Sequence, residues 1–190
     1  HPGPGYGGSC FPKDTQALIY TAKQYDYDLK IVKAVEAVNV LQKERVLFYL
    51  KDVFGAVEGK TIALLGLAFK SNTDDTRDSS SVTILKALLT LGAKVRVFDP
   101  EVKSLDECDS NDLYFASNSY DAVTGADAVM IATEWNAFRE LDLERLFGLM
   151  AQPYFFDLRN LYSPKKLAET GFKAYVIGRQ LISEEVVNPL

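Results

Sequence analysis

One of the two cysteines, Cys10, stands where a thiol could act as a nucleophile. It follows a glycine-rich stretch, residues 3–8, and lies close to Lys13 and Asp14. The spacing predicts a helix beginning at Asp14, and both a helix N-terminus and a nearby lysine favour the nucleophilic thiolate. A lone cysteine is more often a small buried hydrophobic residue, and an aspartate at a helix start is more often a simple cap. The residues alone leave both interpretations open.

The histidine and cysteine counts exclude several kinds of active site. His1 is the only histidine and there are two cysteines. A Ser-His-Asp triad, a Cys-His dyad and a zinc site built from several such residues therefore cannot form within this chain. Acid–base chemistry must use carboxylates, lysines, tyrosines or water. We expect no metal site, and so few cysteines favour a reducing, cytoplasmic setting.

Charge and hydropathy exclude other partners. Among 190 residues, 21 Lys and Arg against 26 Asp and Glu give a net charge of −5, so a broad basic field for nucleic acid or an anionic membrane is absent. The longest apolar run, residues 61–69, is well short of the ~20 residues of a membrane-spanning helix. We expect no nucleic-acid partner, no membrane span and no signal peptide. The chain starts without Met in a loop-like stretch, so we expect a fragment of a longer protein.

Two segments with different patterns of apolar residues follow the glycine-rich stretch. Apolar residues at three- and four-residue steps from Leu29 to Phe54 predict one long connecting helix. Short strand-like runs then alternate with helical segments, which is typical of a parallel sheet covered on both faces. The expected strands are 60–65, 94–98, 113–116, 128–132, 154–156 and 173–177, and the expected helices 80–91, 120–124, 143–150 and 165–169. The predicted fold class is α/β: a helical segment, 1–57, followed by a Rossmann-like parallel-sheet domain, 58–190.

The glycines at 3, 5 and 8 formally satisfy the pattern G-x-G-x-x-G. A dinucleotide fingerprint follows a strand and opens a helix, whereas two residues precede this stretch and Cys10–Pro12 is expected to interrupt any helix. The glycines can instead let backbone amides approach a ligand. Asp99 ends a strand, the usual place of a ribose-binding carboxylate, yet the first strand leads into no glycine fingerprint. The second domain is therefore expected to be Rossmann-like without being a typical dinucleotide site.

Two longer motifs carry a resemblance to a known family. Residues 5–14, GYGGSCFPKD, resemble the catalytic-cysteine motif of the UDP-glucose/GDP-mannose dehydrogenase family. Residues 66–79, GLAFKSNTDDTRDS, resemble its G-L-x-F-K-x-x-T-D-D-x-R signature, and Tyr175–Arg179 is similar to the usual end of these enzymes. The resemblance covers nearly the whole chain. It implies a central helical segment plus the C-terminal nucleotide-sugar-binding domain, with the N-terminal NAD-binding domain absent from this chain.

The resemblance implies a four-electron oxidation, in which the C6 alcohol of a nucleotide-linked hexose becomes a carboxylate and two NAD are reduced. Cys10 would be the nucleophile that forms a thiohemiacetal and then a thioester, and Asp14 the carboxylate that positions or activates water. A homodimer through the long helix is implied as well. The other implied roles are substrate binding by Tyr6, Gly7, Gly8, Phe69, Lys70 and Arg159, and cofactor binding by Lys13 and Arg77.

Several of these residues also have ordinary structural explanations. Phe69 could be a core aromatic and Lys70 a solvated lysine. Arg77 suits a phosphate by its bidentate geometry, but it could equally pair with one of the aspartates at 74, 75 and 78. The serines at 79–81 could offer N–H groups to a phosphate or simply cap the next helix. Trp135 and Cys108 are expected to be structural.

The residues around the cysteine also bear on the substrate. Phe11 and the Pro12–Asp14 run resemble the UDP-glucose branch of the family, which makes UDP-glucuronate for polysaccharide biosynthesis. One alternative is a GDP-mannose or other nucleotide-sugar 6-dehydrogenase. Another, for this chain alone, is a non-catalytic nucleotide-sugar-binding or dimerisation module.

Overall fold

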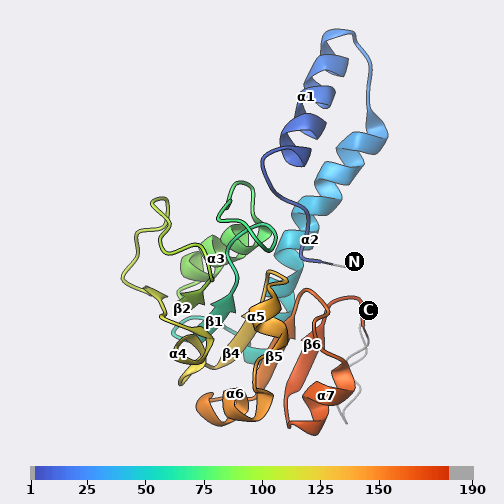
Figure 1. Cartoon of the computed structure of the whole chain (residues 1–190). Helices are drawn as coiled ribbons and strands as arrows, with labels where there is room; N and C mark the ends of the chain where they lie inside the picture. The colour runs from blue at the N-terminus through green and yellow to red at the C-terminus, as the bar shows by residue number, and fades with distance from the viewer. Residues whose placement is uncertain (1–2, 180–190) are drawn as a thin grey trace.

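One sheet of six parallel strands forms the centre of the described chain, in the order β3-β2-β1-β4-β5-β6 (Figure 1). The computed structural model describes residues 3–179, so residues 180–190 of the predicted second domain lie outside the described residues. The strands are β1 (Thr61–Leu65), β2 (Lys94–Phe98), β3 (Leu113–Phe115), β4 (Ala128–Ile131), β5 (Tyr154–Asp157) and β6 (Lys173–Val176). The helices are α1 (Phe11–Gln24), α2 (Lys30–Phe54), α3 (Ser80–Thr90), α4 (Ser119–Val123), α5 (Asn136–Arg139), α6 (Leu143–Leu149) and α7 (Pro164–Glu169).

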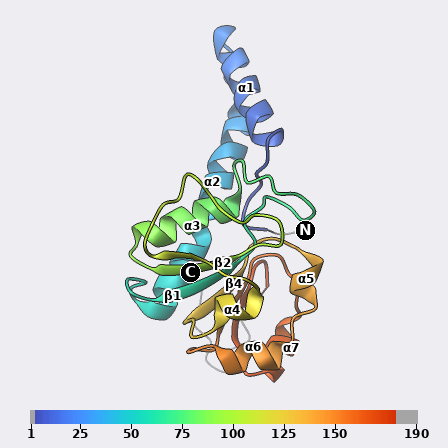
Figure 2. The same cartoon turned by 60° about the vertical axis from the view of Figure 1, so that its left-hand side comes forward.

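The central strands are apolar on both faces because helices cover both. All of β4 and all but the first residue of β1 are buried, as expected where a parallel sheet lies between two helical layers. Helices α2 and α3 pack together on one face, and α4 and α6 on the other (Figure 2). The predicted α/β fold class is confirmed. The strand order reverses between the neighbours β1 and β4, and ligands of open parallel sheets bind beyond the carboxyl ends of strands at such a point.

Helix α2 links the sheet to a helical hairpin that projects away from it. Its last turns carry the buried Val46 and Leu50, and the helix ends at Gly55, whose left-handed backbone suits a C-terminal cap. Its first turns pack with α1 in the projecting hairpin (Figure 1). Within residues 3–179, no helix is both long and apolar enough to cross a membrane.

The structure corrects the prediction at two helices, α1 and α5. Helix α1 begins at Phe11 rather than after Asp14, so Cys10–Pro12 opens the helix instead of interrupting it. The physical reason is that proline fits the first helical turn, where its missing N–H has no partner to lose. The four-residue helix α5, Asn136–Arg139, was not predicted because so short a segment has no readable periodicity.

Gly66 ends β1 in a conformation that only glycine adopts easily. Its φ is +97°, and a Cβ built there would lie 2.5 Å from Cβ of Thr133, which follows β4. The Gly66 N–H donates to the carbonyl of Phe98 at 2.8 Å, so the turn is held from β2 as well. This turn sets the direction in which the chain leaves the central strand.

We expect Gly66→Ala to destabilise the protein by about 2–5 kcal/mol, from left-handed backbone strain plus overpacking against Thr133. Gly125→Ala is the matched control, since Gly125 also has a positive φ, +71°, but no atom within 4 Å of an added Cβ. The control should lose about 1–2 kcal/mol, from strain alone. Urea denaturation measures both, and equal losses would contradict the packing argument.

Candidate active site

The two motif segments, far apart in sequence, lie directly against each other. A Cβ at Gly7 would come within 2.3 Å of the carbonyl oxygen of Asp78, and one at Gly8 within 2.7 Å of the Phe69 ring. The Gly8 N–H donates to the carbonyl of Arg77 at 2.9 Å. Glycine is required at both positions because any side chain would separate the segments. The contact joins the glycine loop directly to the segment that follows β1.

Cys10 occupies the N-cap position of α1 and is exposed. Its sulfur lies 3.7 Å from the Ser9 hydroxyl oxygen, and its carbonyl accepts the N–H of Asp14 at 2.9 Å. Asp14 is therefore a first-turn residue rather than the cap. Its exposed carboxylate lies 3.7 Å from Nζ of Lys13, and both side chains point into solvent. A thiol, a carboxylate and an ammonium group thus share the first turn of one helix.

Arg77 follows Asp75 in the segment that contacts the cysteine loop, where its carbonyl accepts the N–H of Gly8. Its Nε and Nη2 donate to the two carboxylate oxygens of Asp75 at 2.9 and 2.7 Å. Arg77 therefore forms an ion pair with one of the three neighbouring aspartates, as its structural explanation requires. Hydrogen bonding to Arg77 lowers the pKa of Asp75. The hydrogen bonds and the negative charge of Asp75 in turn raise the pKa of Arg77. The side chain of Arg77 is 70% exposed despite this ion pair.

Phe69 and Lys70 lie near the start of the loop that follows β1, a few residues beyond the carboxyl end of the strand. The Phe69 N–H donates to the carbonyl of Asp75 at 3.0 Å, which closes this loop on itself. Nζ of Lys70 lies 5.4 Å from the Phe69 ring centre, and the lysine is exposed. Phe69 is a half-buried aromatic residue packed on Gly8, outside the buried core.

Asp99, at the end of β2, holds the start of that loop. Its Oδ2 accepts the N–H groups of Leu67 at 2.7 Å and Ala68 at 3.1 Å, and the indole N–H of Trp135 at 3.2 Å. Its other oxygen accepts two backbone N–H groups of the following loop. In a dinucleotide-binding domain, the carboxylate at this position would bind a ribose. Here both of its oxygens already accept hydrogen bonds from the protein itself. The sequence identified Asp99 by its position but did not predict this role.

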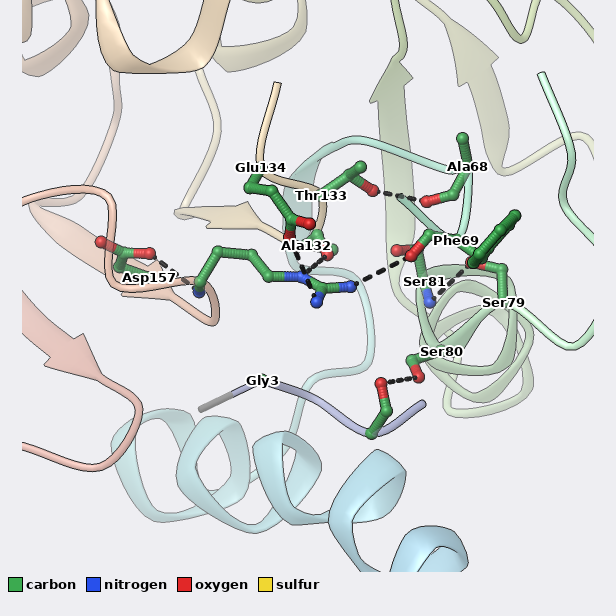
Figure 3. Close-up of polar contacts among 12 residues, drawn as sticks. Gly3, Ala68, Phe69, Ser79, Ser80, Ser81, Ala132, Thr133, Glu134 and Asp157 are labelled. Carbon is green, nitrogen blue, oxygen red and sulfur yellow. Dashed lines mark hydrogen bonds and ion pairs between the residues drawn. The ribbon is translucent and has the colours of Figure 1, made fainter. Parts of the chain in front are cut away.

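The side chain of Arg159 extends across the carboxyl ends of two strands toward Phe69. Its partners Ala132, Glu134 and Phe69 are labelled in Figure 3. Its Nε donates to the carbonyl of Ala132 at 2.7 Å, Nη1 pairs with Glu134 at 3.2 Å, and Nη2 lies 3.5 Å from the carbonyl of Phe69. Burial lowers the pKa of Arg159, and the charge of Glu134 opposes that effect. The cation is fixed in direction at the point where the strand order reverses. The sequence predicted Arg159 but missed Glu134, which has no motif signal of its own.

The buried carboxylate of Asp157 shapes the turn that carries Arg159. It accepts the N–H groups of Arg159 at 3.0 Å and Tyr162 at 2.9 Å. Burial raises the pKa of Asp157, and these backbone N–H groups partly offset the shift. An open hollow of about 720 Å³ lies between Arg159, the glycine loop and the first half of α2.

Comparison with known proteins identifies the family. The family model described as the UDP binding domain of the UDP-glucose/GDP-mannose dehydrogenase family matches residues 63–164. The central-domain model of that family matches residues 1–40. The chain belongs to the UDP-glucose/GDP-mannose dehydrogenase family. The resemblance predicted from the two motifs is confirmed.

Several relatives in this family are longer proteins that are named UDP-glucose 6-dehydrogenase. The chain is 45% identical to a UDP-glucose 6-dehydrogenase of Pseudomonas aeruginosa over 93% of its length, and 44% identical to one of Rhizobium meliloti over 94%. It spans about two fifths, 41%, of each relative. A UDP-glucose dehydrogenase structure from Pyrobaculum islandicum is 32% identical with a TM-score of 0.77, covering 92% of this chain and 37% of that one. An NDP-N-acetyl-D-galactosaminuronic acid dehydrogenase structure from Methanosarcina mazei has a TM-score of 0.82 at 26% identity, covering 95% and 40%.

The exposed Asp75–Arg77 pair makes a pH-dependent prediction. In Arg77→Gln, the pKa of Asp75 should rise toward its ordinary value of 3.8, because the hydrogen bonds that favour the charged carboxylate are lost. The pair lowers the folded-state pKa, so its stabilisation is present above the unfolded-state pKa and is lost as pH falls through the lowered value. An NMR titration of the Asp75 carboxyl carbon measures the change.

Lys86→Gln is the control, because it removes another surface ion pair, with Glu107, at a different place. It should leave the Asp75 titration unchanged. An Asp75 pKa that stays low in Arg77→Gln would show that another group lowers it.

Proposed function

We propose that the chain is the C-terminal part of a UDP-glucose 6-dehydrogenase, which converts UDP-glucose to UDP-glucuronate by two NAD-dependent oxidations. The observation that carries the proposal is the direct contact between the cysteine loop and the Phe69–Asp78 segment. That contact brings a nucleophile next to the carboxyl edge of the domain matched by the family's UDP-binding model. The UDP-glucose 6-dehydrogenases among the relatives support the choice of sugar.

The residues that we propose for UDP-glucose lie at that edge. The exposed Lys70 and the ordered Arg159 supply positive charge for a diphosphate, and the Phe69 ring offers a face for the nucleoside. The hexose would then lie along the glycine loop, near Cys10. The proposed substrate contacts are the backbone of Tyr6, Gly7 and Gly8 and the side chains of Phe69, Lys70 and Arg159.

The α/β domain itself does not fit a dinucleotide. The carboxylate of Asp99 already accepts hydrogen bonds from backbone N–H groups of the protein. The turn after β1 also has a single glycine in place of the glycine-rich dinucleotide fingerprint. The exposed cations Lys13 and Arg77 do fit the edge of a bound pyrophosphate. We propose that upstream residues hold most of NAD, which supplies the hydride acceptor for both oxidations. Lys13 and Arg77 would complete its binding from this chain.

The chemistry assigned to this chain centres on the sulfur of Cys10. Once the C6 alcohol has become an aldehyde, the thiolate adds to its carbon; a C–S bond forms and the oxygen takes a proton, giving a thiohemiacetal. Loss of a second hydride and of the hydroxyl proton gives a thioester. Water then attacks the thioester carbon, the C–S bond breaks, and the thiolate and the carboxylate are released. Asp14, one turn along the same helix, would orient that water or accept its proton.

Domain roles and assembly form part of the same proposal. Residues 1–57 would be the cysteine loop and central helical segment, and 58–190 the UDP-sugar-binding domain. Ile31, Val38 and Leu41 of α2 are 80%, 62% and 63% exposed, an apolar surface that supports a homodimer through this helix. We also propose a cytoplasmic location, which suits a free catalytic thiol, and a place in polysaccharide biosynthesis.

The complete protein, with its upstream part, tests the function. With UDP-glucose we expect about two NADH per sugar, one for each hydride that the thiol route removes. Cys10→Ser should lower turnover on the order of a thousandfold or more while sparing UDP-glucose binding, because a hydroxyl without an adjacent base is a weak nucleophile. NADH absorbance measures turnover, and calorimetry measures binding.

Cys108→Ser is the matched control, since Cys108 is half-buried in the loop that follows β2 and should leave turnover unchanged. Faster turnover with GDP-mannose or a UDP-N-acetylhexosamine would show that this nucleotide sugar, and not UDP-glucose, is the substrate. Full turnover in Cys10→Ser would overturn the covalent mechanism.

A further inference from the structure

Asn39 is a nearly buried polar residue on the long helix α2, with 9% of its surface exposed. Its carboxamide faces the glycine loop and pairs with both backbone polar groups of one residue. Oδ1 accepts the N–H of Tyr6 at 2.8 Å, and Nδ2 donates to the carbonyl of Tyr6 at 3.1 Å. A carboxamide suits this position because it presents one acceptor and one donor side by side, as a carboxylate or an alkyl group cannot.

The loop passes so close to Asn39 that its backbone geometry depends on this contact. A Cβ at Gly5, where φ is +111°, would lie 2.8 Å from Oδ1 of Asn39. The carbonyl of Gly5 accepts the Ser80 hydroxyl at 3.0 Å, in a contact drawn in Figure 3. Further along, the Gly8 N–H is bound by the carbonyl of Arg77. The segment before Cys10 is therefore fixed from the helix at Tyr6 and from the α/β domain at Gly5 and Gly8.

Tyr6 has a second connection to the same helix. Its hydroxyl donates to Oε1 of Glu36 at 2.6 Å, and that oxygen also accepts the hydroxyl of Thr15 on α1. The ring of Tyr6 packs edge-on against Phe11, the residue after the cysteine, with ring centres 4.6 Å apart. Movement of the Tyr6 backbone would therefore displace the first turn of α1 together with its N-cap residue, Cys10.

We propose that Asn39 is a positioning residue for the oxidation: by fixing the Tyr6 backbone, it sets the distance between the sulfur of Cys10 and the hexose. This inference rests on the proposed function. The nucleotide is bound by other residues, Phe69, Lys70 and Arg159, so Asn39 affects the reacting end of the substrate and not its anchor. Small errors in such a distance lower the chemical step much more than binding.

Asn39→Asp in the complete protein tests the inference, because the acid has almost the same shape but cannot donate to Tyr6 when charged. At about pH 8 we expect kcat to fall about 100-fold, with KM for UDP-glucose changed less than about threefold. The ratio of variant to unchanged kcat should recover between about pH 8 and pH 6, because burial raises the pKa of a carboxyl and the protonated acid donates again. A constant ratio, or equal changes in kcat and KM, would overturn the inference.

Other ionisable groups around Asn39 are Glu36 and Lys43 on α2, Tyr6 in the loop, and Asp78 and Arg159 from the α/β domain. Both proteins share them, so the ratio of their kcat values removes their titration. Gln42→Glu is the matched control, because Gln42 lies on the same helix and, among the described residues, donates to the carbonyl of Gly3 at 2.9 Å and not to Tyr6. Its kcat should stay within about threefold of the unchanged protein, whereas a loss equal to that of Asn39→Asp would overturn the role of the Tyr6 contact.

A second measurement separates this inference from the proposed function. UDP-glucose should slow the alkylation of Cys10 by iodoacetamide in the unchanged protein, and much less in Asn39→Asp at about pH 8. Protection without NAD reduction would reject the proposed oxidation and keep the positioning role, whereas equal protection in both proteins would reject the positioning role. If Asn39→Asp does not fold, as judged by circular dichroism, Asn39→Gln replaces it. That variant keeps both hydrogen-bonding groups on a longer side chain, and an unchanged kcat there would overturn the inference.

Discussion

The site depends on the close approach of two backbone segments, the glycine loop before Cys10 and the segment that leaves β1. Backbone atoms come this near only where side chains are absent, which is why glycine stands at positions 7 and 8. The hydrogen bond between Gly8 and Arg77 then sets the register of the contact. This one contact brings together an exposed thiol, a guanidinium and an aromatic ring from distant parts of the chain.

Buried carboxylates organise the other side of the site. Asp99 and Asp157 stand at the carboxyl ends of two strands, and each accepts several N–H groups from the turn that follows or faces it. A buried carboxylate is stable when hydrogen bonds replace its hydration, so the turns and the carboxylates stabilise one another. Their effect is to hold Phe69 and Arg159 in fixed directions without using either side chain to fill the core. The lysines at 13 and 70 are exposed instead, and Lys13 lies 3.7 Å from the equally exposed carboxylate of Asp14.

Prediction from the sequence succeeded where the signal is local. The strands and the longer helices fall within about two residues of their predicted limits, because apolar periodicity reports which residues face a core. The predicted start of α1 is wrong because Asp14 has the side chain of a typical cap, whereas Pro12 fits a first turn equally well and the helix begins before it. Arg77 illustrates a different limit. Its position in the motif suggests a contact with the cofactor, whereas the neighbouring aspartates suggest an ion pair. Only the structure shows that Arg77 pairs with Asp75.

The sequence by itself determined the order of the elements, the glycines that permit close approach, and the residues able to do chemistry, since all of these follow from side-chain type and spacing. The tertiary structure alone decided which of them meet. Asn39 against Tyr6, Gly8 against Phe69 and Asp99 against Leu67 are separated by more than thirty residues, and nothing in their local sequences indicates the pairing. Such contacts exist because the folded sheet and the long helix bring distant backbone polar groups out of water together, where each must find a partner.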